Sequence, residues 1–130
     1  MSSVTLLSLI SVSIGAVLGA ETRFWVTGKL KRFEPLPYGT LFVNVTGAFG
    51  LGLFSMYALA IGLQTDLTAL IGTGFFGCYT TMSSFAVETV GLNDESWKLA
   101  IINLILMISF VFVGALIGEF IGNSIGTMFI

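Results

Sequence analysis

A cluster of small polar side chains interrupts an apolar stretch in the middle of this chain. Between Gly72 and Glu88, hydroxyl groups lie close together on four residues, Thr80, Thr81, Ser83 and Ser84. Irregular backbone is tolerated at membrane depth only where protein buries it or where it lines a water-filled cavity. Interrupted spans of known transporters place such backbone against ions. With the flexible Gly77 beside it, the cluster predicts a broken helix that forms an ion site.

Such a site would recognise ions rather than perform covalent chemistry. Hydroxyls and the amide of Asn44 donate hydrogen bonds without carrying charge, and aromatic ring edges carry partial positive charge. A pathway lined by these groups would hold a small anion less tightly than a lysine would, as rapid passage requires. Carbonyls exposed at Gly77 and Thr80 have the opposite polarity and would suit a cation such as sodium. Asn44 also has a simpler interpretation, because an amide within an apolar span often bonds to a neighbouring helix.

The composition indicates an integral membrane protein. Hydrophobic residues make up 55% of the 130 residues and charged residues only 9%, whereas the surface of a soluble domain would have to be largely polar. The net charge of −2 and the absence of histidine argue against a nucleic-acid partner and against a histidine-ligated metal. The single cysteine, Cys78, excludes an intrachain disulfide and leaves the redox compartment open.

Enzymatic chemistry has no support in the sequence. There is no Ser-His-Asp set, no Cys-His metal spacing and no phosphate-cradling loop. The chain is therefore not expected to be an enzyme.

The elements that position the polar cluster are predicted to be four transmembrane helices in a single membrane domain, all-α in fold class. Each apolar segment is about as long as the roughly 20 residues needed to cross a bilayer, and four spans put both termini on one side. The first segment lacks a basic leading region, so it is expected to be a span rather than a cleaved signal. The predicted spans cover about residues 4–25, 38–62, 67–91 and 97–121.

Glycines spaced four apart predict close helix packing. Gly15 and Gly19 form a small-xxx-small pair in the first span. A longer stripe in the fourth span consists of Gly114, Gly118, Gly122 and Gly126. We interpret both as smooth faces that admit a neighbouring backbone.

Two motifs resemble the Fluc (CrcB) family of small fluoride channels. They are Gly39-Thr-Leu-Phe-Val-Asn-Val-Thr-Gly47 and Gly74-Phe-Phe-Gly-Cys-Tyr-Thr-Thr-Met-Ser-Ser-Phe85. The resemblance covers essentially the whole chain, including the glycine-containing first span that ends near Arg23. It implies a multi-pass protein of the cell membrane that exports toxic cytoplasmic fluoride by passive permeation. It also implies an antiparallel dimer with two fluoride pathways and a structural sodium ion at the centre.

The same resemblance implies roles for individual residues. The backbone carbonyls of Gly77 and Thr80 from each subunit would hold the sodium. A carboxylate near one pore end would be Glu88, whose role stays open. The fluoride pathway would be lined by Asn44, Phe85, Met82, Ser83, Ser84, Thr40 and Ser109.

Met82 departs from the family pattern, which usually has phenylalanine at this position. Methionine is flexible and polarisable but has no quadrupolar ring edge. Two interpretations stay open. The terminal methyl of Met82 presents weakly positive hydrogens to an anion, or Met82 only packs and the pore it contributes to is weakened.

Two other functions are alternatives to the channel. A small proton-coupled drug exporter of four helices needs an essential carboxylate inside a span, and its candidates, Glu21 and Glu88, lie near predicted span ends. A non-transporting membrane subunit would need only the glycine stripes. Neither alternative explains why the third span is broken.

The distribution of basic residues predicts the orientation in the membrane. All of them lie in or beside the loops after spans one and three: Arg23, Lys29, Lys31, Arg32 and Lys98. Because basic residues mark cytoplasmic loops, those loops are expected in the cytoplasm and both termini outside. Dual topology would require a near-zero bias, so we expect a paralogous partner inserted the opposite way rather than an identical chain. The bias is thinner if Arg23 belongs to the first span, where it and the aromatics beside it could equally anchor the helix end.

Overall fold

The structure is a computed structural model that describes residues 6–30 and 35–128. Its described residues form helices and connecting turns, with no strand among them. Three helices are long: α1 (Leu6–Leu30), α2 (Tyr38–Ala60) and α6 (Trp97–Gly126). The third predicted span is a row of shorter elements, namely α3 (Thr65–Thr68), the π-helix η1 (Ala69–Phe76), α4 (Gly77–Tyr79) and α5 (Met82–Glu95). The predicted all-α fold class is confirmed.

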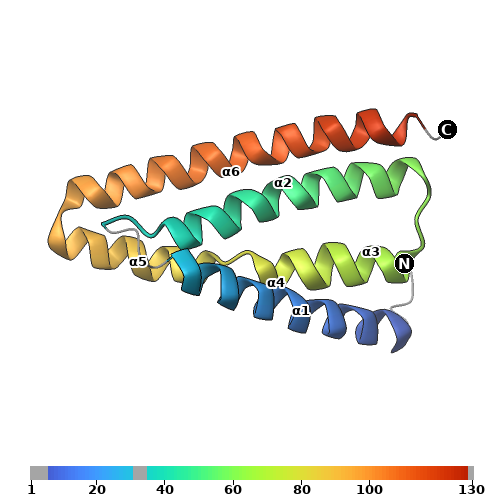
Figure 1. Ribbon diagram of the computed structural model, residues 1–130, viewed down its shortest axis with the longest axis horizontal. Coiled ribbons are helices and arrows are strands. Elements are labelled where there is room, and N and C mark those ends of the chain that lie inside the picture. Colours follow the sequence, from blue (N-terminus) through green and yellow to red (C-terminus); the bar gives the residue numbers. More distant parts are fainter. Residues whose placement is uncertain (1–5, 31–34, 129–130) are drawn as a thin grey trace.

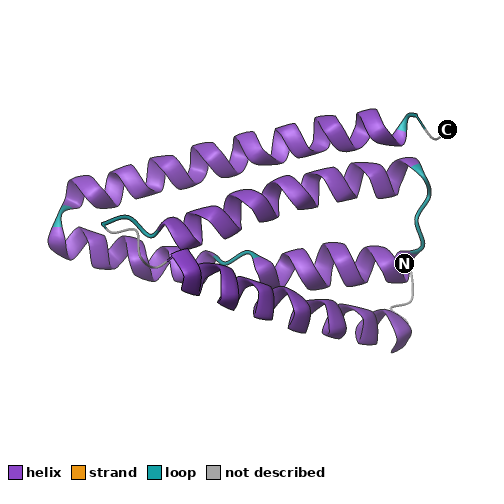
Figure 2. Cartoon of the chain, in the orientation of Figure 1, coloured by secondary structure: helices purple, strands orange, loops and turns teal. Residues whose placement is uncertain are grey.

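The helices run back and forth along one axis (Figure 1). In this view α2 lies between α6 and the row from α3 to α5, with α1 along the other side of that row. The first turn of α1 and the last turn of α6 lie at the same end of the bundle. Figure 2 shows the loop that separates α4 from α5 near the middle of the row.

Among the described residues, three helices are long and apolar enough to cross a membrane, α1, α2 and α6. The third span does not qualify as one helix because its longest α-helix, α5, has only 14 residues. Two long helices continue past the predicted ends of their spans, α1 to Leu30 and α6 to Gly126. Interfacial residues such as Trp25 anchor a helix in the bilayer but do not stop its backbone hydrogen bonding.

The end of α2 has a clear local cause. Gly62 adopts φ +64°, a left-handed conformation that glycine adopts without steric cost. The N–H of Leu63 then donates to the carbonyl of Ala58 at 2.9 Å, and the N–H of Gly62 donates to Leu59 at 3.4 Å. This pair of bonds is a Schellman motif. It ends α2 at Ala60 and turns the chain towards α3.

The glycine stripe of α6 packs directly on the backbone of α2, as predicted. Gly114, Gly118, Gly122 and Gly126 are all buried. A Cβ added at Gly114 would lie 3.1 Å from the carbonyl oxygen of Val45. A Cβ at Gly118 would collide with the Phe49 carbonyl. The two helices therefore approach as closely as their backbones allow.

The predicted close contact at Gly15 and Gly19 is also confirmed, and its partner is η1. A Cβ at Gly15 would collide with the carbonyl oxygen of Leu70, and one at Gly19 with that of Phe75. From the other side, a Cβ at Gly74 would lie 2.6 Å from the carbonyl oxygen of Val12. The bundle thus consists of two tightly packed pairs, α2 with α6 and α1 with η1.

Candidate functional site

The helix break in the third span is confirmed, and it lies at Thr80 and Thr81. Thr80 has φ −76° and ψ 157°, and Thr81 has φ −148° and ψ 117°, so both are extended. Gly77, which was expected to supply the flexibility, is itself helical with φ −61° and ψ −34°. The break therefore depends on what satisfies the backbone of Thr80 and Thr81 outside a helix.

Asn44 satisfies both backbone groups of Thr81. The N–H of Thr81 donates to Asn44 Oδ1 at 2.7 Å, and Asn44 Nδ2 donates to the Thr81 carbonyl at 2.9 Å. The amide also approaches Met107 Sδ at 3.5 Å, and Asn44 is only 8% exposed. Buried backbone groups need partners. The structure therefore supports the helix-bridging interpretation of Asn44, which holds the extended segment against α2.

The hydroxyl of Thr81 caps the helix that follows the break. Thr81 Oγ1 accepts a hydrogen bond from the N–H of Ser84 at 3.2 Å, which satisfies one free donor at the start of α5. It also donates to Ser84 Oγ at 3.1 Å and lies 3.3 Å from Ser83 Oγ. Three members of the predicted hydroxyl cluster, Thr81, Ser83 and Ser84, thus form one connected group at the N-terminus of α5, whereas the Thr80 hydroxyl donates to the Phe76 carbonyl at 3.0 Å.

The carbonyl of Thr80 has a charged partner. Arg23 Nη1 donates to this oxygen at 3.2 Å, from a partly buried position on α1. α1 continues for seven residues beyond Arg23, to Leu30, so Arg23 does not lie at the end of the helix. Arg23 is therefore part of α1 and not of the loop that follows it.

A cavity of about 410 Å³ lies beside the break. It contains three of the predicted pathway residues: Asn44, Phe85 and Met82. Phe85 is 4% exposed and forms part of the packed wall, whereas Met82 is 73% exposed. Thr80, Thr81 and Met107 also line this cavity, so the broken backbone borders it.

The other predicted pathway residues lie elsewhere. Ser83 and Ser84 line a second hollow of about 330 Å³ with Val87 and Glu88. Thr40 is 3% exposed and donates to Glu88 Oε1 at 2.8 Å, which places it behind that hollow. Ser109 is exposed on α6 and lines neither space. The structure therefore brings the predicted residues together in two groups and leaves Ser109 outside both.

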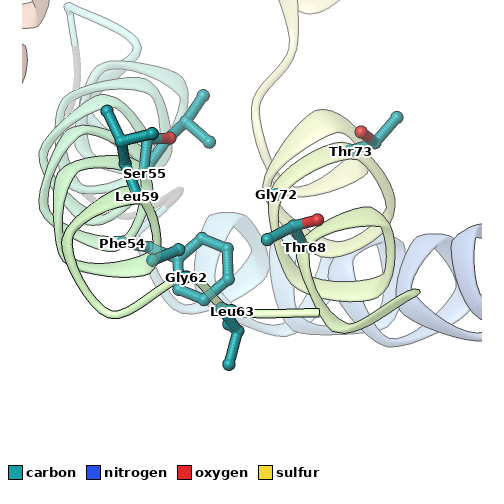
Figure 3. A pocket seen from close by; sticks show the side chains of 10 residues that line it. Phe54, Ser55, Leu59, Gly62, Leu63, Thr68, Gly72 and Thr73 are labelled. Atoms are coloured by element: carbon teal, nitrogen blue, oxygen red, sulfur yellow. The ribbon is translucent and has the colours of Figure 1, made fainter. Parts of the chain in front are cut away.

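A larger hollow, of about 570 Å³, contains none of the predicted site residues. It lies between the second half of α2 and the elements α3 and η1 (Figure 3). Its walls are mostly apolar, and its side-chain polar groups are the hydroxyls of Ser55, Thr68 and Thr73. It shares the lining residue Leu51 with the cavity beside the break but contains neither Thr80 nor Thr81, so we do not assign it to the site.

Comparison with known proteins decides the family. A model of the CrcB-like protein family, described as camphor resistance (CrcB), matches residues 10–128. The chain belongs to this family. It is 40% identical over 116 residues to fluoride-specific ion channel FluC 2 of Rhodopseudomonas palustris strain BisB18, which covers 85% of this chain and 88% of the relative.

Two further relatives carry a similar name. Fluoride-specific ion channel FluC of Thermococcus onnurineus is 34% identical over 116 residues, covering 85% of this chain and 94% of that one. FluC of Methylococcus capsulatus is 35% identical over 87% of this chain, but the chain spans only 53% of that relative's length. The relatives are named as channels, in agreement with the prediction that this CrcB-like chain is not an enzyme. The three apolar helices agree with the prediction of a multi-pass membrane protein.

One polar contact of this CrcB-like chain had no role in the predicted site. Asn103 is 2% exposed on α6, and its Nδ2 donates to Thr89 Oγ1 at 2.9 Å. Thr89 Oγ1 in turn donates to the carbonyl of Phe85 at 2.7 Å. The pair fixes the turn of α5 that carries Phe85. An amide inside an apolar span is the same signal that pointed to Asn44.

Proposed function

We propose that this chain forms a fluoride-selective channel through which toxic cytoplasmic fluoride leaves the cell by passive permeation. The observation that carries the proposal is the broken third span, whose extended backbone borders a cavity in a chain whose relatives are named fluoride-specific ion channels. An all-helical packing role would need no such break.

The side chains around the break have the chemistry that fluoride requires. Fluoride is small and accepts hydrogen bonds strongly, so its dehydration must be offset by donors. The hydroxyls of Ser83 and Ser84 lie at one hollow, and the ring of Phe85 lies at the other. A ring edge and neutral donors attract an anion without trapping it. The proposed pathway also includes Asn44, Thr40, Met82 and Ser109. The Thr40 hydroxyl donates to Glu88 in this structure, and Met82 is exposed.

The proposed sodium site fits the residues that the break provides. The N–H of Thr81 donates to Asn44 instead of closing a helical turn onto the Gly77 carbonyl. Thr80 is extended, so its carbonyl also lies outside the helical hydrogen bonding. Gly77 is exposed, with nothing within 4 Å of the position of an added Cβ. Carbonyl oxygens are suitable ligands for a hard cation, and a bound sodium would supply the positive charge that holds two such breaks together.

The proposed partner is a second four-helix subunit in antiparallel orientation. Both hollows at the break are open at the surface of this chain, and Met82 is exposed at the edge of one, where a partner's side chains would complete the lining. Arg23 lies seven residues before the end of α1 and makes a polar contact to the break, so the predicted bias for a fixed orientation rests mainly on the other four basic residues. Lys29, in the last turn of α1, and Lys98, at the start of α6, are both exposed, and Lys31 and Arg32 lie outside the described residues.

We retain a paralogous chain as the proposed partner. The test is a C-terminal tag whose accessibility from outside the cell is measured without any partner. External tags in nearly all copies are expected, because the basic residues after α1 and at the start of α6 favour the cytoplasm. An even division between inside and outside would instead mean a dual-topology homodimer.

The experiment that tests the main proposal is ion efflux from liposomes that contain the purified protein. Fluoride efflux is expected and chloride efflux is not, because chloride is larger and a weaker hydrogen-bond acceptor. Equal efflux of both ions, or of neither, would contradict a fluoride-selective channel. Exhaustive replacement of sodium by a large organic cation on both sides should stop fluoride efflux, and sustained efflux would remove the sodium site from the proposal.

A further inference from the structure

The Arg23 guanidinium contacts one of the two carbonyls proposed to hold sodium. Arg23 Nη1 lies 3.2 Å from the oxygen of Thr80. The position of Arg23 is fixed by the helix packing one turn earlier, where a Cβ on Gly19 would collide with the Phe75 carbonyl and lie 3.0 Å from the Tyr79 N. α1 therefore cannot move away from α4 without opening that contact.

This arrangement places a permanent positive charge at the break. The guanidinium does not deprotonate in proteins, and a charge within a membrane span is costly without a partner. Arg23 donates a hydrogen bond to the Thr80 carbonyl, which has no helical hydrogen-bond partner because its backbone is extended. Each group therefore stabilises the other in a single protomer.

We propose that Arg23 competes with sodium for the Thr80 carbonyl and thereby sets the sodium concentration that this chain requires. The inference rests on the proposed sodium site. A carbonyl oxygen has two lone pairs and can accept from two partners, but two cations on one oxygen lie within a few ångströms and repel each other. Arg23 would thus act as a tethered cation that satisfies the break in the free protomer and weakens sodium binding in the assembled protein.

The test is a sodium titration that measures the thermal unfolding midpoint of the purified protein in lipid nanodiscs. Sodium chloride replaces choline chloride at constant ionic strength. A ligand that binds only the folded state raises the free energy of unfolding by RT ln(1 + [L]/Kd), so a fit of this relation to the midpoints gives the dissociation constant, which is the half-saturating sodium concentration. Arg23→Gln removes the charge, and Arg23→Lys keeps it. The matched control is Lys29→Gln, which removes an exposed charge from the last turn of the same helix.

Arg23→Gln is expected to lower the half-saturating sodium concentration by about tenfold or more, because repulsion between unit charges a few ångströms apart exceeds a tenfold effect even at an effective dielectric constant of about 20. Arg23→Lys and Lys29→Gln should stay near the value of the unmodified chain. If the unmodified chain responds to sodium but the half-saturating concentration in Arg23→Gln is unchanged or higher, the proposed competition is wrong. The proposed sodium site would not be contradicted by that result.

The remaining outcomes separate this inference from the proposed function. If neither the unmodified chain nor any variant responds to sodium, the proposed sodium site is wrong, and the proposed competition is wrong as well. If Arg23→Gln does not fold, Arg23→Lys decides. Its shorter side chain keeps the charge but loses the planar fork, and a tenfold tighter sodium response from it would show that charge repulsion is not the cause.

Discussion

The packed helix pairs and the broken third span satisfy their backbones in opposite ways. Where α6 contacts α2, both helices keep their backbone hydrogen bonds, and glycine takes the place of residues with side chains. Gly118 therefore packs directly on the Phe49 carbonyl. At the break, the backbone gives up helical hydrogen bonds and polar side chains replace them, chiefly Asn44 on Thr81. Close packing without polar groups makes a rigid frame. Freed backbone with polar partners makes a site that an ion can use.

The largest effect is expected from filling the glycine face. Gly118→Leu would force α6 away from α2, because even a Cβ collides with the Phe49 carbonyl. We expect a loss of folded protein, with a cost of at least about 3 kcal/mol from overpacking. The measurement is the yield of monodisperse protein and its unfolding midpoint. Gly28→Leu is the control, since nothing lies within 4 Å of a Cβ at that position. Equal yields and unfolding midpoints for the two variants would contradict the close packing of α6 on α2.

Asn44→Ala should have the next largest effect. It leaves the N–H and carbonyl of Thr81 without their partner, at roughly 1–3 kcal/mol for each buried group. The unfolding midpoint should fall, and fluoride flux should fall by a factor of about 10 to 100. Asn123→Ala, on an exposed position of α6, is the matched control and should change neither. Full flux in a stable Asn44→Ala protein would show that neither the break nor the pathway depends on this amide.

Substitutions at the cavity wall test the site without disturbing the frame. Phe85→Ile keeps bulk in the packed wall but removes the ring edge, so fluoride flux should fall by about tenfold if that edge is worth roughly 1 kcal/mol or slightly more. Met82→Phe is expected to be tolerated or to increase flux, because it would add a ring edge to the cavity that Met82 lines. Liposome efflux measures both. Unchanged flux in Phe85→Ile would show that the Phe85 ring contributes only to packing and not to fluoride permeation.

Thr80→Ala should have the smallest effect. The Thr80 hydroxyl donates at 3.0 Å to the carbonyl of Phe76, four residues earlier in the chain, and the proposed sodium ligand is the backbone oxygen of Thr80. We expect a stability change within about 0.5 kcal/mol and a sodium requirement like that of the unmodified chain. A large rise in the sodium needed for flux would mean that the side chain, and not the carbonyl, is the ligand.

The sequence alone determined the membrane class, the helical fold, the glycine faces and the existence of the break. Each of these depends on local composition or on spacing along one helix, as in the stripe from Gly114 to Gly126 or the hydroxyl cluster after Thr80. A four-residue repeat of glycine defines a smooth face whatever packs against it. The apolar flanks of the cluster likewise fix its depth without knowledge of its neighbours.

Only the tertiary structure decided which polar groups meet. Arg23 and Thr80 are 57 residues apart, and Asn44 and Thr81 are 37 apart. Whether they touch depends on the rotation and depth of separate helices, which the packing of Gly19 sets for Arg23. The same geometry leaves Ser109 outside the two hollows lined by Asn44, Met82, Phe85, Ser83 and Ser84. Helix faces can be predicted from periodicity, but the partner that each face meets is chosen by the packing of the whole bundle.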